Sequence, residues 1–218
     1  MNFKGYKITD AELVRLVSQP LPADEGKRRA RLRADGIDRV IYVCPECGIS
    51  RLTAKGEYIR CGICNRAIKL LPSGELECEG AELPFSSIDG WYGYQEDFVR
   101  ALPVVELADS PILCDTAAFI DVTTRRRNII LRKAALTLYA NRIVVAAPNG
   151  EEIDFGFDTL SDVCLGGVCA VNIYYGDEVY QFKGRSGFCA LKYVNLFYKY
   201  KSAAAGEKRA EYLGVEKE

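Results

Sequence analysis

Four cysteines constrain this chain more than any other feature of its sequence. Cys44 and Cys47 lie in the segment CPECG, Cys61 and Cys64 lie in CGICN, and thirteen residues separate the two pairs. Each Cys-x-x-Cys segment can form a tight turn that directs two thiolates and two backbone N–H groups at one centre, and the segment between the pairs has the length of a hairpin. The spacing therefore predicts a zinc ribbon in which four thiolates hold a tetrahedral Zn²⁺.

Two other interpretations of these cysteines compete with zinc. An iron centre is the closer alternative, because four thiolates suit iron as well. Disulfides or ordinary buried thiols are the second, although adjacent Cys-x-x-Cys pairs rarely serve packing alone. A four-thiolate zinc site leaves no open position for water or substrate, so we expect the metal to be structural.

The chain contains no histidine. This absence excludes imidazole general bases, Ser-His and Cys-His nucleophile pairs, and histidine metal ligands. The sequence offers no other constellation of base and nucleophile. We therefore predict no catalytic residues in this chain.

Charge, apolar runs and cysteine usage indicate in which cellular compartment the protein is expected. Its 29 basic and 30 acidic residues nearly cancel, which argues against a surface built wholly for nucleic acid. The N-terminus lacks the apolar run of a signal peptide, and no apolar run approaches the roughly 20 residues of a membrane span. We expect a cytoplasmic protein that can also lie peripherally at the inner face of the membrane. Five further cysteines lie among apolar residues and are expected to be reduced core residues: Cys78, Cys114, Cys164, Cys169 and Cys189.

The hydrophobic pattern predicts an α+β fold with two modules joined by a helix. A ribbon of this size has a marginal core, so metal ligation must supply much of its folding free energy. Short strands at hairpin spacing, followed by an amphipathic helix, predict a small antiparallel barrel whose open end the helix closes. The expected segments are a helical and basic N-terminal segment at 1–38, the zinc ribbon at 39–82, a connector helix and linker at 83–110, the barrel with its C-terminal helix at 111–202, and a flexible tail at 203–218.

Turn and capping residues predict the individual elements of the second half. Ser86 or Ser87 opens the connector helix, which ends before Pro103, and Ser186 opens the last helix, which runs to about 202. The strands are expected near 112–121, 128–132, 135–140, 142–147, 151–156, 161–165, 168–175 and 178–183.

Two basic clusters are candidate contacts for anions. The first is an arm before the ribbon, made of Lys27, Arg28, Arg29, Arg31 and Arg33. It can contact the phosphates of lipid headgroups or of nucleic acid, or it can be a solvated arm that packs against a further domain. The second lies at or near the first hairpin of the barrel and is made of Arg125, Arg126, Arg127, Arg132 and Lys133.

Three stretches, DGIDRVIYVCPECG, IRCGIC and FSSIDGWYGYQEDFVR, resemble the region that follows the catalytic domain in certain bacterial 1-acyl-sn-glycerol-3-phosphate acyltransferases. The resemblance covers roughly residues 33–101. It implies that a basic stretch leads into the four-cysteine ribbon and then into a Phe-Ser-x-Ile-x-x-Trp-Tyr helix. The matching residues after the cysteines are Phe85, Ser86, Ile88, Trp91 and Tyr92, with Arg100 further along.

The downstream half is similar to barrels of the pleckstrin-homology (PH) and GRAM type. The similarity lies in LTLYANRIVVAAPNGEEIDFGFDTLSDV, then VNIYYGDEVYQFKG, then a helix. In PH domains that bind phosphoinositides, basic residues on the first hairpin grip the headgroup. The resemblance therefore implies that the cluster from Arg125 to Lys133 contacts anionic lipid.

The chain departs from the acyltransferases at their catalytic box. That box is His-x-x-x-x-Asp, which a chain without histidine cannot contain, and the first 38 residues leave no room for the catalytic domain. The chain is either the C-terminal piece of such an enzyme or a free-standing relative of that piece. We expect a non-catalytic, zinc-binding accessory module, associated with glycerophospholipid acyltransfer, that binds anionic lipid or a partner such as the catalytic domain. The alternative is a zinc-ribbon regulator that binds nucleic acid through the basic arm.

Overall fold

The computed structural model describes the ribbon, the barrel and the last helix, beginning at Leu32. Leu32–Glu218 form one compact unit, so the ribbon and the barrel are described together. Most of the basic arm and the expected N-terminal helix lie outside the described residues. The described residues are 32–147, 149–185 and 187–205.

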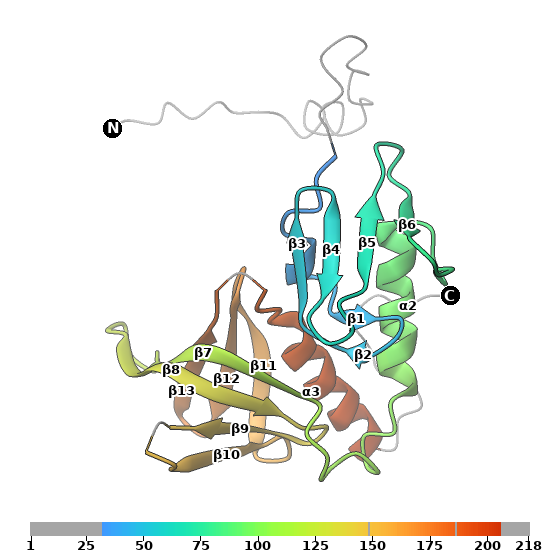
Figure 1. Cartoon of the computed structure of the whole chain (residues 1–218). Helices are drawn as coiled ribbons and strands as arrows, with labels where there is room; N and C mark the ends of the chain where they lie inside the picture. The colour runs from blue at the N-terminus through green and yellow to red at the C-terminus, as the bar shows by residue number, and fades with distance from the viewer. Residues whose placement is uncertain (1–31, 148, 186, 206–218) are drawn as a thin grey trace, which may run out of the picture. The chain divides into compact units, whose positions relative to one another are not determined.

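The ribbon is built from short antiparallel strands (Figure 1). After a 3-10 turn, η1 (Ile37–Arg39), the strands β1 (Val43–Cys44) and β2 (Gly48–Ile49) pair around the first Cys-x-x-Cys segment. A four-stranded sheet in sequence order follows, and its inward side chains include Ile59, Cys61 and Ile68. Its strands are β3 (Leu52–Lys55), β4 (Tyr58–Cys61), β5 (Ala67–Leu70) and β6 (Leu76–Cys78).

The connector helix α2 (Ile88–Ala101) begins where its capping residue predicts. The Ser87 hydroxyl accepts a hydrogen bond from the Gly90 N–H at 3.1 Å, and the helix ends before Pro103. Trp91 stacks on Phe85 with ring centroids 4.8 Å apart, and its indole N–H donates to the Val43 carbonyl at 2.8 Å. Because Trp91 is 1% exposed, it is a core residue of the ribbon and not an interfacial anchor.

The second half is one antiparallel sheet of seven strands in the order β10-β9-β8-β7-β13-β12-β11. The sheet curls around a core of alternating inward side chains, and helix α3 (Leu191–Ala204) lies against that core (Figure 1). The expected architecture, an α+β fold with a curled antiparallel sheet and a C-terminal helix, is confirmed. The strands are β7 (Leu113–Asp121), β8 (Asn128–Leu138), β9 (Arg142–Ala146), β10 (Glu152–Gly156), β11 (Leu160–Gly167), β12 (Ala170–Tyr175) and β13 (Glu178–Lys183).

Two details of the barrel differ from the expectation. The segments 128–132 and 135–140 belong to a single strand, β8, because β8 itself bulges: its residues 129–134 face only residues 117–120 of the partner β7, and the extra residues break the alternation without ending the strand. The last helix begins at Leu191 and not near 186, whose own placement lies outside the described residues. Gly187 has a φ of +83°, which no helix can contain, so the chain cannot become helical until it has passed this residue.

The ribbon and the barrel share one hydrophobic core. Tyr42, Val43 and Ile49 of the ribbon and Val99 of α2 pack in the same cluster as the inward residues of the barrel and α3. Polar contacts reinforce this junction: the Asn195 side chain donates to the Tyr42 hydroxyl at 2.7 Å. The contact between the ribbon and the barrel is therefore made by buried residues of both halves.

Gln95 is the polar residue that ties α2 to the ribbon. Its amide oxygen accepts from the N–H groups of Tyr42 at 2.7 Å and Val43 at 3.3 Å, and its amide nitrogen donates to the Val40 carbonyl at 3.1 Å. The side chain is fully buried. We expect Gln95→Leu to lower the free energy of unfolding by about 2–4 kcal/mol, because the buried N–H groups of Tyr42 and Val43 and the part-buried carbonyl of Val40 lose this partner. Urea unfolding measures the change, and the exposed Asp97→Leu on the same helix should change stability by less than about 0.5 kcal/mol.

The remaining cysteines do not all occupy the core. All five are free thiols, but only Cys189 is buried, and Cys114 is exposed on β7. The expectation of five core cysteines was wrong for Cys114, because its position on β7 alternates outward between inward neighbours. In the part of the chain that the structure describes, no helix is long and apolar enough to cross a bilayer.

Candidate metal centre and basic surfaces

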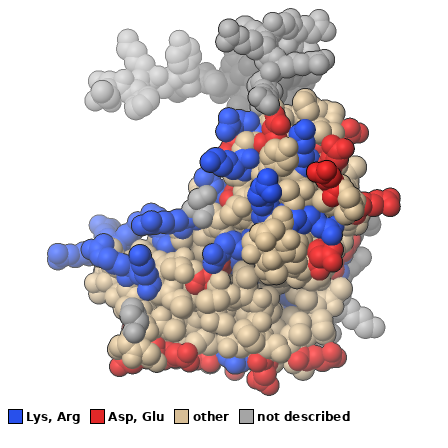
Figure 2. Space-filling model, in the orientation of Figure 1, with Lys and Arg blue, Asp and Glu red and all other residues tan. Residues whose placement is uncertain are grey.

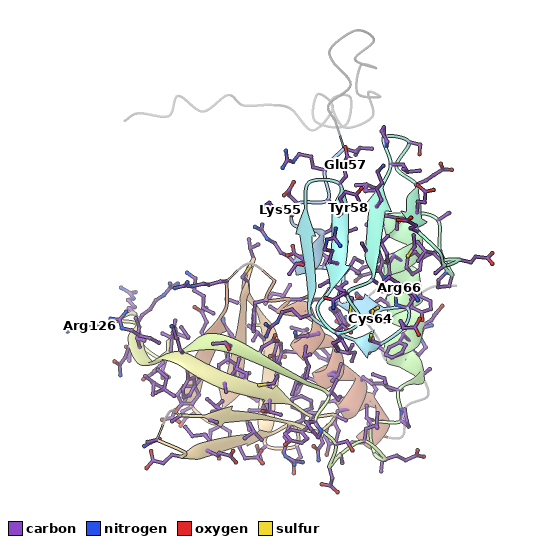
Figure 3. All side chains as sticks on the ribbon, viewed as in Figure 1. Lys55, Glu57, Tyr58, Cys64, Arg66 and Arg126 are labelled. Carbon is purple, nitrogen blue, oxygen red and sulfur yellow. The ribbon has the colours of Figure 1, made fainter. Side chains whose placement is uncertain are left out.

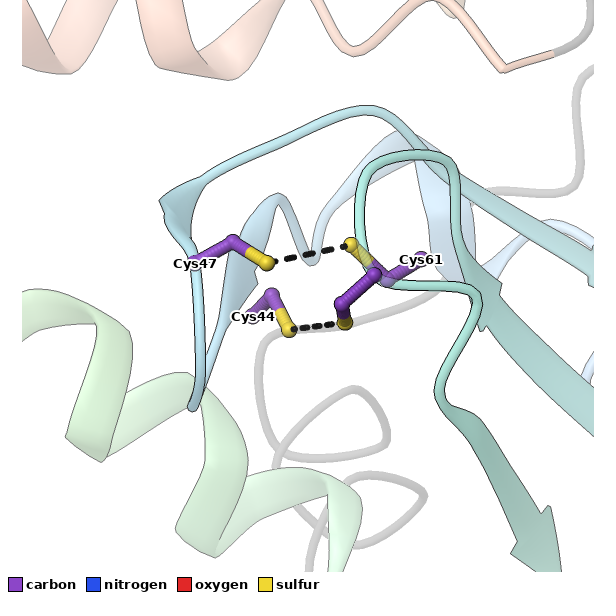
Figure 4. Close-up of side chains that lie close together, drawn as sticks. Cys44, Cys47 and Cys61 are labelled. Carbon is purple, nitrogen blue, oxygen red and sulfur yellow. Dashed lines mark hydrogen bonds between the residues drawn. The ribbon is translucent and has the colours of Figure 1, made fainter.

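The four cysteines of the two Cys-x-x-Cys segments lie together. Their Sγ atoms are all within 4.8 Å of one another, with Cys44 to Cys64 at 3.8 Å and Cys47 to Cys61 at 4.0 Å. The labelled side chains in Figure 4 point into one space between the β1–β2 turn and the turn after β4. The prediction that these four cysteines form one cluster is confirmed, and their role as metal ligands stays a prediction.

The sulfur positions fit a tetrahedral metal. Four thiolates about 2.3 Å from a central Zn²⁺ lie about 3.8 Å from one another, close to the distances here. A disulfide needs a sulfur–sulfur distance of about 2.05 Å, which these pairs far exceed. The cluster can therefore hold one metal ion through four thiolates. Iron has the same donor preference and would fit the same positions.

Hydrogen bonds from backbone N–H groups stabilise the thiolate form of a cysteine in this cluster. The Ile63 N–H donates to Cys61 Sγ at 3.4 Å, and burial and these backbone donors act on the thiols in opposite directions. Burial raises the pKa of Cys61, but the backbone N–H groups of Cys64 and Ile63 outweigh it and lower that pKa to about 7. At Cys44 and Cys47 burial is the dominant effect, and it raises the pKa of Cys44 to about 11 and that of Cys47 to about 12. A bound cation would reverse the burial effect, because it removes the cost of burying the thiolates.

The arginines that flank the cysteines have other partners. Arg66 pairs with the Glu46 carboxylate at 2.6 Å, and Arg60 lies over the Tyr58 ring at 5.5 Å. Figure 3 shows Cys64 and Arg66 at one end of the ribbon strands and Tyr58 at the other. The side chain of Arg51 extends from the ribbon to the barrel, where it contacts the Cys114 carbonyl and the Asp115 carboxylate. These side chains bind carboxylate, ring and backbone groups, not the cysteine sulfurs.

The three arginines from Arg125 to Arg127 form the tip of the β7–β8 hairpin. All three are exposed, and Figure 3 shows Arg126 at the far end of this hairpin, remote from the ribbon. Directly after them, Ile129 is 47% exposed and Ile130 is 42% exposed. This part of β8 extends beyond β9, which pairs only with residues 135–138, so both faces of the strand meet solvent.

Arg132 and Lys133 lie further along β8 and do not share the hairpin tip. They line a pocket of about 540 Å³ between β7, β8, the segment after β13 and the ribbon. The sequence cluster from Arg125 to Lys133 is thus two surfaces, a projecting tip and a pocket wall. The pocket is lined by Arg51, Asp115, Thr116, Ala117, Ala118, Arg132, Lys133, Lys183, Gly184, Arg185, Gly187 and Phe188.

Three cations of this pocket were missed by the sequence analysis: Arg51, Lys183 and Arg185. Lys183 and Arg185 are neighbours in the sequence, but Arg51 lies far from them, and only the fold brings the three to one place. The segment GRSG between the last strand and the last helix was the one available signal, because such a glycine-flanked basic loop must lie at the end of the barrel. The arm residue Arg33, by contrast, is exposed and pairs with Asp35 at 2.6 Å.

A buried ionic network lies under the pocket. The Asp115 carboxylate is 2.5 Å from the Lys192 ammonium, accepts a hydrogen bond from the Tyr193 hydroxyl at 2.9 Å, and meets Arg51 at 3.3 Å. Burial raises the pKa of Tyr193 well above its ordinary value, and the charge of Asp115 adds to the effect, so the phenol stays a hydrogen-bond donor. The network joins β7, α3 and the ribbon.

Comparisons with known proteins leave the family open. No family model matches the chain, and no curated protein matches it. Among solved structures, the chain is similar to the Vps36 N-terminal PH domain, at 14% identity and a TM-score of 0.35 over 44% of this chain and 82% of that one. It is also similar to the N-terminal PH domain of human ARAP2, at 8% identity and a TM-score of 0.36 over 48% of this chain and 93% of that one. Likeness at this level defines neither a family nor a function.

Proposed function

We propose that this chain is a non-catalytic module in which a structural zinc ribbon is fused to a PH-like barrel that contacts anionic lipid. The observation that carries the proposal is the hairpin tip, where three arginines stand beside two exposed isoleucines. Cationic side chains attract an anionic bilayer surface, and exposed apolar side chains next to them can enter its interfacial region.

The charge distribution supports an oriented contact. Figure 2 shows Lys and Arg gathered over the β7–β8 hairpin and the neighbouring face of the ribbon, with Asp and Glu along the edge of the barrel near β9 and β10. The net charge of the whole chain is only −1, so a long-range attraction to an anionic surface depends on this separation. The basic face would approach the membrane and the acidic edge would point away.

The proposed accessory role in glycerophospholipid acylation rests on the resemblance over residues 33–101. The residues that carry it occupy one structural junction: Phe85 and Trp91 stack, and Ile88 and Tyr92 pack against the same ribbon core. A sequence pattern that defines a packed junction is more specific than scattered matches. In this role the module would place an acyltransferase catalytic domain at the surface where its lipid substrate lies.

We expect the triple variant Arg125→Glu, Arg126→Glu and Arg127→Glu to weaken binding to anionic vesicles at least tenfold. Each Lys or Arg close to an anionic surface contributes about 1 kcal/mol, and the reversal replaces three attractions with repulsions. Cosedimentation with vesicles of phosphatidylglycerol and phosphatidylcholine measures the effect. Ile129→Ser with Ile130→Ser, which keeps the charge, should also weaken binding and leave its salt dependence unchanged.

A matched control reverses three cations of the ribbon, of which Lys55 and Arg60 are exposed and Lys69 is half-buried: Lys55→Glu, Arg60→Glu and Lys69→Glu. If this control loses as much vesicle binding as the tip variant, net charge and not the hairpin determines binding. If the parent chain binds no vesicles but retains RNA or DNA in a salt-sensitive way, the nucleic-acid regulator replaces the proposal.

A further inference from the structure

The pocket beside the ribbon is lined by a group of cationic residues. Three segments that are distant in sequence meet there: the ribbon, the paired strands β7 and β8, and the segment between β13 and α3. They bring five cationic side chains around a space of about 540 Å³. The cations are Arg51, Arg132, Lys133, Lys183 and Arg185.

Four of these cations form no ion pair with a carboxylate of the described residues. Within residues 32–147, 149–185 and 187–205, no carboxylate lies within ion-pair distance of Arg132, Lys133, Lys183 or Arg185. Like charges that converge without counter-charges repel one another, and a bound anion relieves this repulsion. The pocket therefore has the charge of an anion-binding site.

The one acidic residue of the pocket does not oppose an anion. Asp115 is 2% exposed, lies 2.5 Å from the buried Lys192 and accepts a hydrogen bond from Tyr193. Its charge is thus neutralised from beneath. Its remaining contact, with Arg51 at 3.3 Å, holds the guanidinium of the ribbon at the pocket wall, where a second contact to the Cys114 carbonyl at 3.2 Å also fixes it.

The walls of the pocket are set by close packing. A Cβ atom on Gly184 would lie 2.1 Å from the Phe188 ring, so this position requires glycine for the segment after β13 to fold back over Phe188. Phe188 is itself buried. Lys183 and Arg185, on either side of Gly184, are held at the rim by this turn. The pocket is a built feature of the junction and not a gap between mobile side chains.

We infer that this pocket binds a phosphomonoester group. A phosphomonoester carries up to two negative charges and three terminal oxygens, which arginine guanidinium groups bind in a bidentate manner and lysines neutralise. The inference deepens the proposed function, on which it rests for the membrane context, by naming the headgroup chemistry of a second, separate surface. The hairpin tip would respond to total surface charge, whereas the pocket would select a terminal phosphate.

The test is a titration of the full chain with inorganic phosphate, measured by isothermal titration calorimetry. We expect the variant Lys183→Gln with Arg185→Gln to weaken phosphate binding at least tenfold. The matched control Lys55→Gln with Arg60→Gln removes the same charge from the exposed ribbon surface and should bind like the parent. All four side chains are exposed, so circular dichroism should show unchanged folding for both variants.

Vesicle arms identify the source of the phosphate. At equal surface charge, a parent chain that prefers phosphatidic acid over phosphatidylglycerol, with the preference lost in the pocket variant, indicates a lipid headgroup. Loss of inorganic phosphate binding with no such preference indicates a soluble phosphate ester. The inference is overturned if the parent does not bind phosphate at millimolar concentration, or if the pocket variant binds as the parent does. Either result leaves vesicle binding through the hairpin tip, and hence the proposed function, to its own test.

Discussion

Replacing Cys61 by Ser is expected to unfold the ribbon. On the proposal that the site holds zinc, the metal contributes an apparent free energy of about 10–16 kcal/mol at neutral pH, as in zinc-finger peptides. The total stability of a domain is about 5–15 kcal/mol, so the ribbon cannot remain folded without most of that contribution. Trp91 is the only tryptophan and is buried in the ribbon core, so its fluorescence should shift to longer wavelength when the ribbon opens.

The effect should extend beyond the ribbon. Because Tyr42, Val43 and Ile49 pack in the same core as the barrel, the thermal transition of the whole unit should also fall. Chelation of the wild-type metal should reproduce both changes. Cys78→Ser is the matched control, since Cys78 lies in the same sheet but outside the cluster, and it should leave the fluorescence unchanged. A chelated protein with native fluorescence and a native transition would refute a structural metal.

The second large effect is expected at Asp115. We expect Asp115→Ala to lower the free energy of unfolding by about 3–5 kcal/mol, because it leaves the fully buried Lys192 without its counter-charge. Loss of the hydrogen bond from the Tyr193 hydroxyl adds to the cost. Chemical denaturation with a fixed m-value measures the change.

Two further variants separate the buried charge from the general loss of packing. The double variant Asp115→Leu with Lys192→Met removes both charges and should recover most of the lost stability, because apolar residues can replace a buried ion pair. Arg51→Gln removes only the half-exposed partner of Asp115 and should cost less than about 1 kcal/mol. A double variant as unstable as Asp115→Ala would show that packing, and not the unpaired ammonium, determines the loss.

Local signals in the sequence predicted the cysteine cluster and most of the elements. The spacing of two Cys-x-x-Cys segments brings four thiols together through short-range geometry, and Ser87 and Pro103 delimit α2 through capping and the missing proline N–H. The strand β8 was divided in the prediction because bulges within β8, opposite residues 117–120 of β7, break its alternation while its pairing with β7 continues on both sides. The start of α3 was placed too early because Gly187 adopts a left-handed conformation.

The pocket could not be predicted because it depends on long-range packing. Arg51, Lys133 and Arg185 come from segments far apart in the chain, and no periodicity links them. The resemblance to PH-type barrels pointed to the first hairpin and grouped Arg132 and Lys133 with the tip, whereas the structure places them in the pocket. A cluster that is contiguous in sequence was thus divided between two surfaces by the direction of one strand.

The metal content of the purified chain tests the central claim most directly. Inductively coupled plasma mass spectrometry should find one zinc atom per chain, and thiol alkylation should reach Cys44, Cys47, Cys61 and Cys64 only after a chelator has been added. Cys44→Ser should lose the metal. A metal-free wild-type chain that is folded, with the four cluster thiols reactive without chelator or joined in disulfides, would contradict the account.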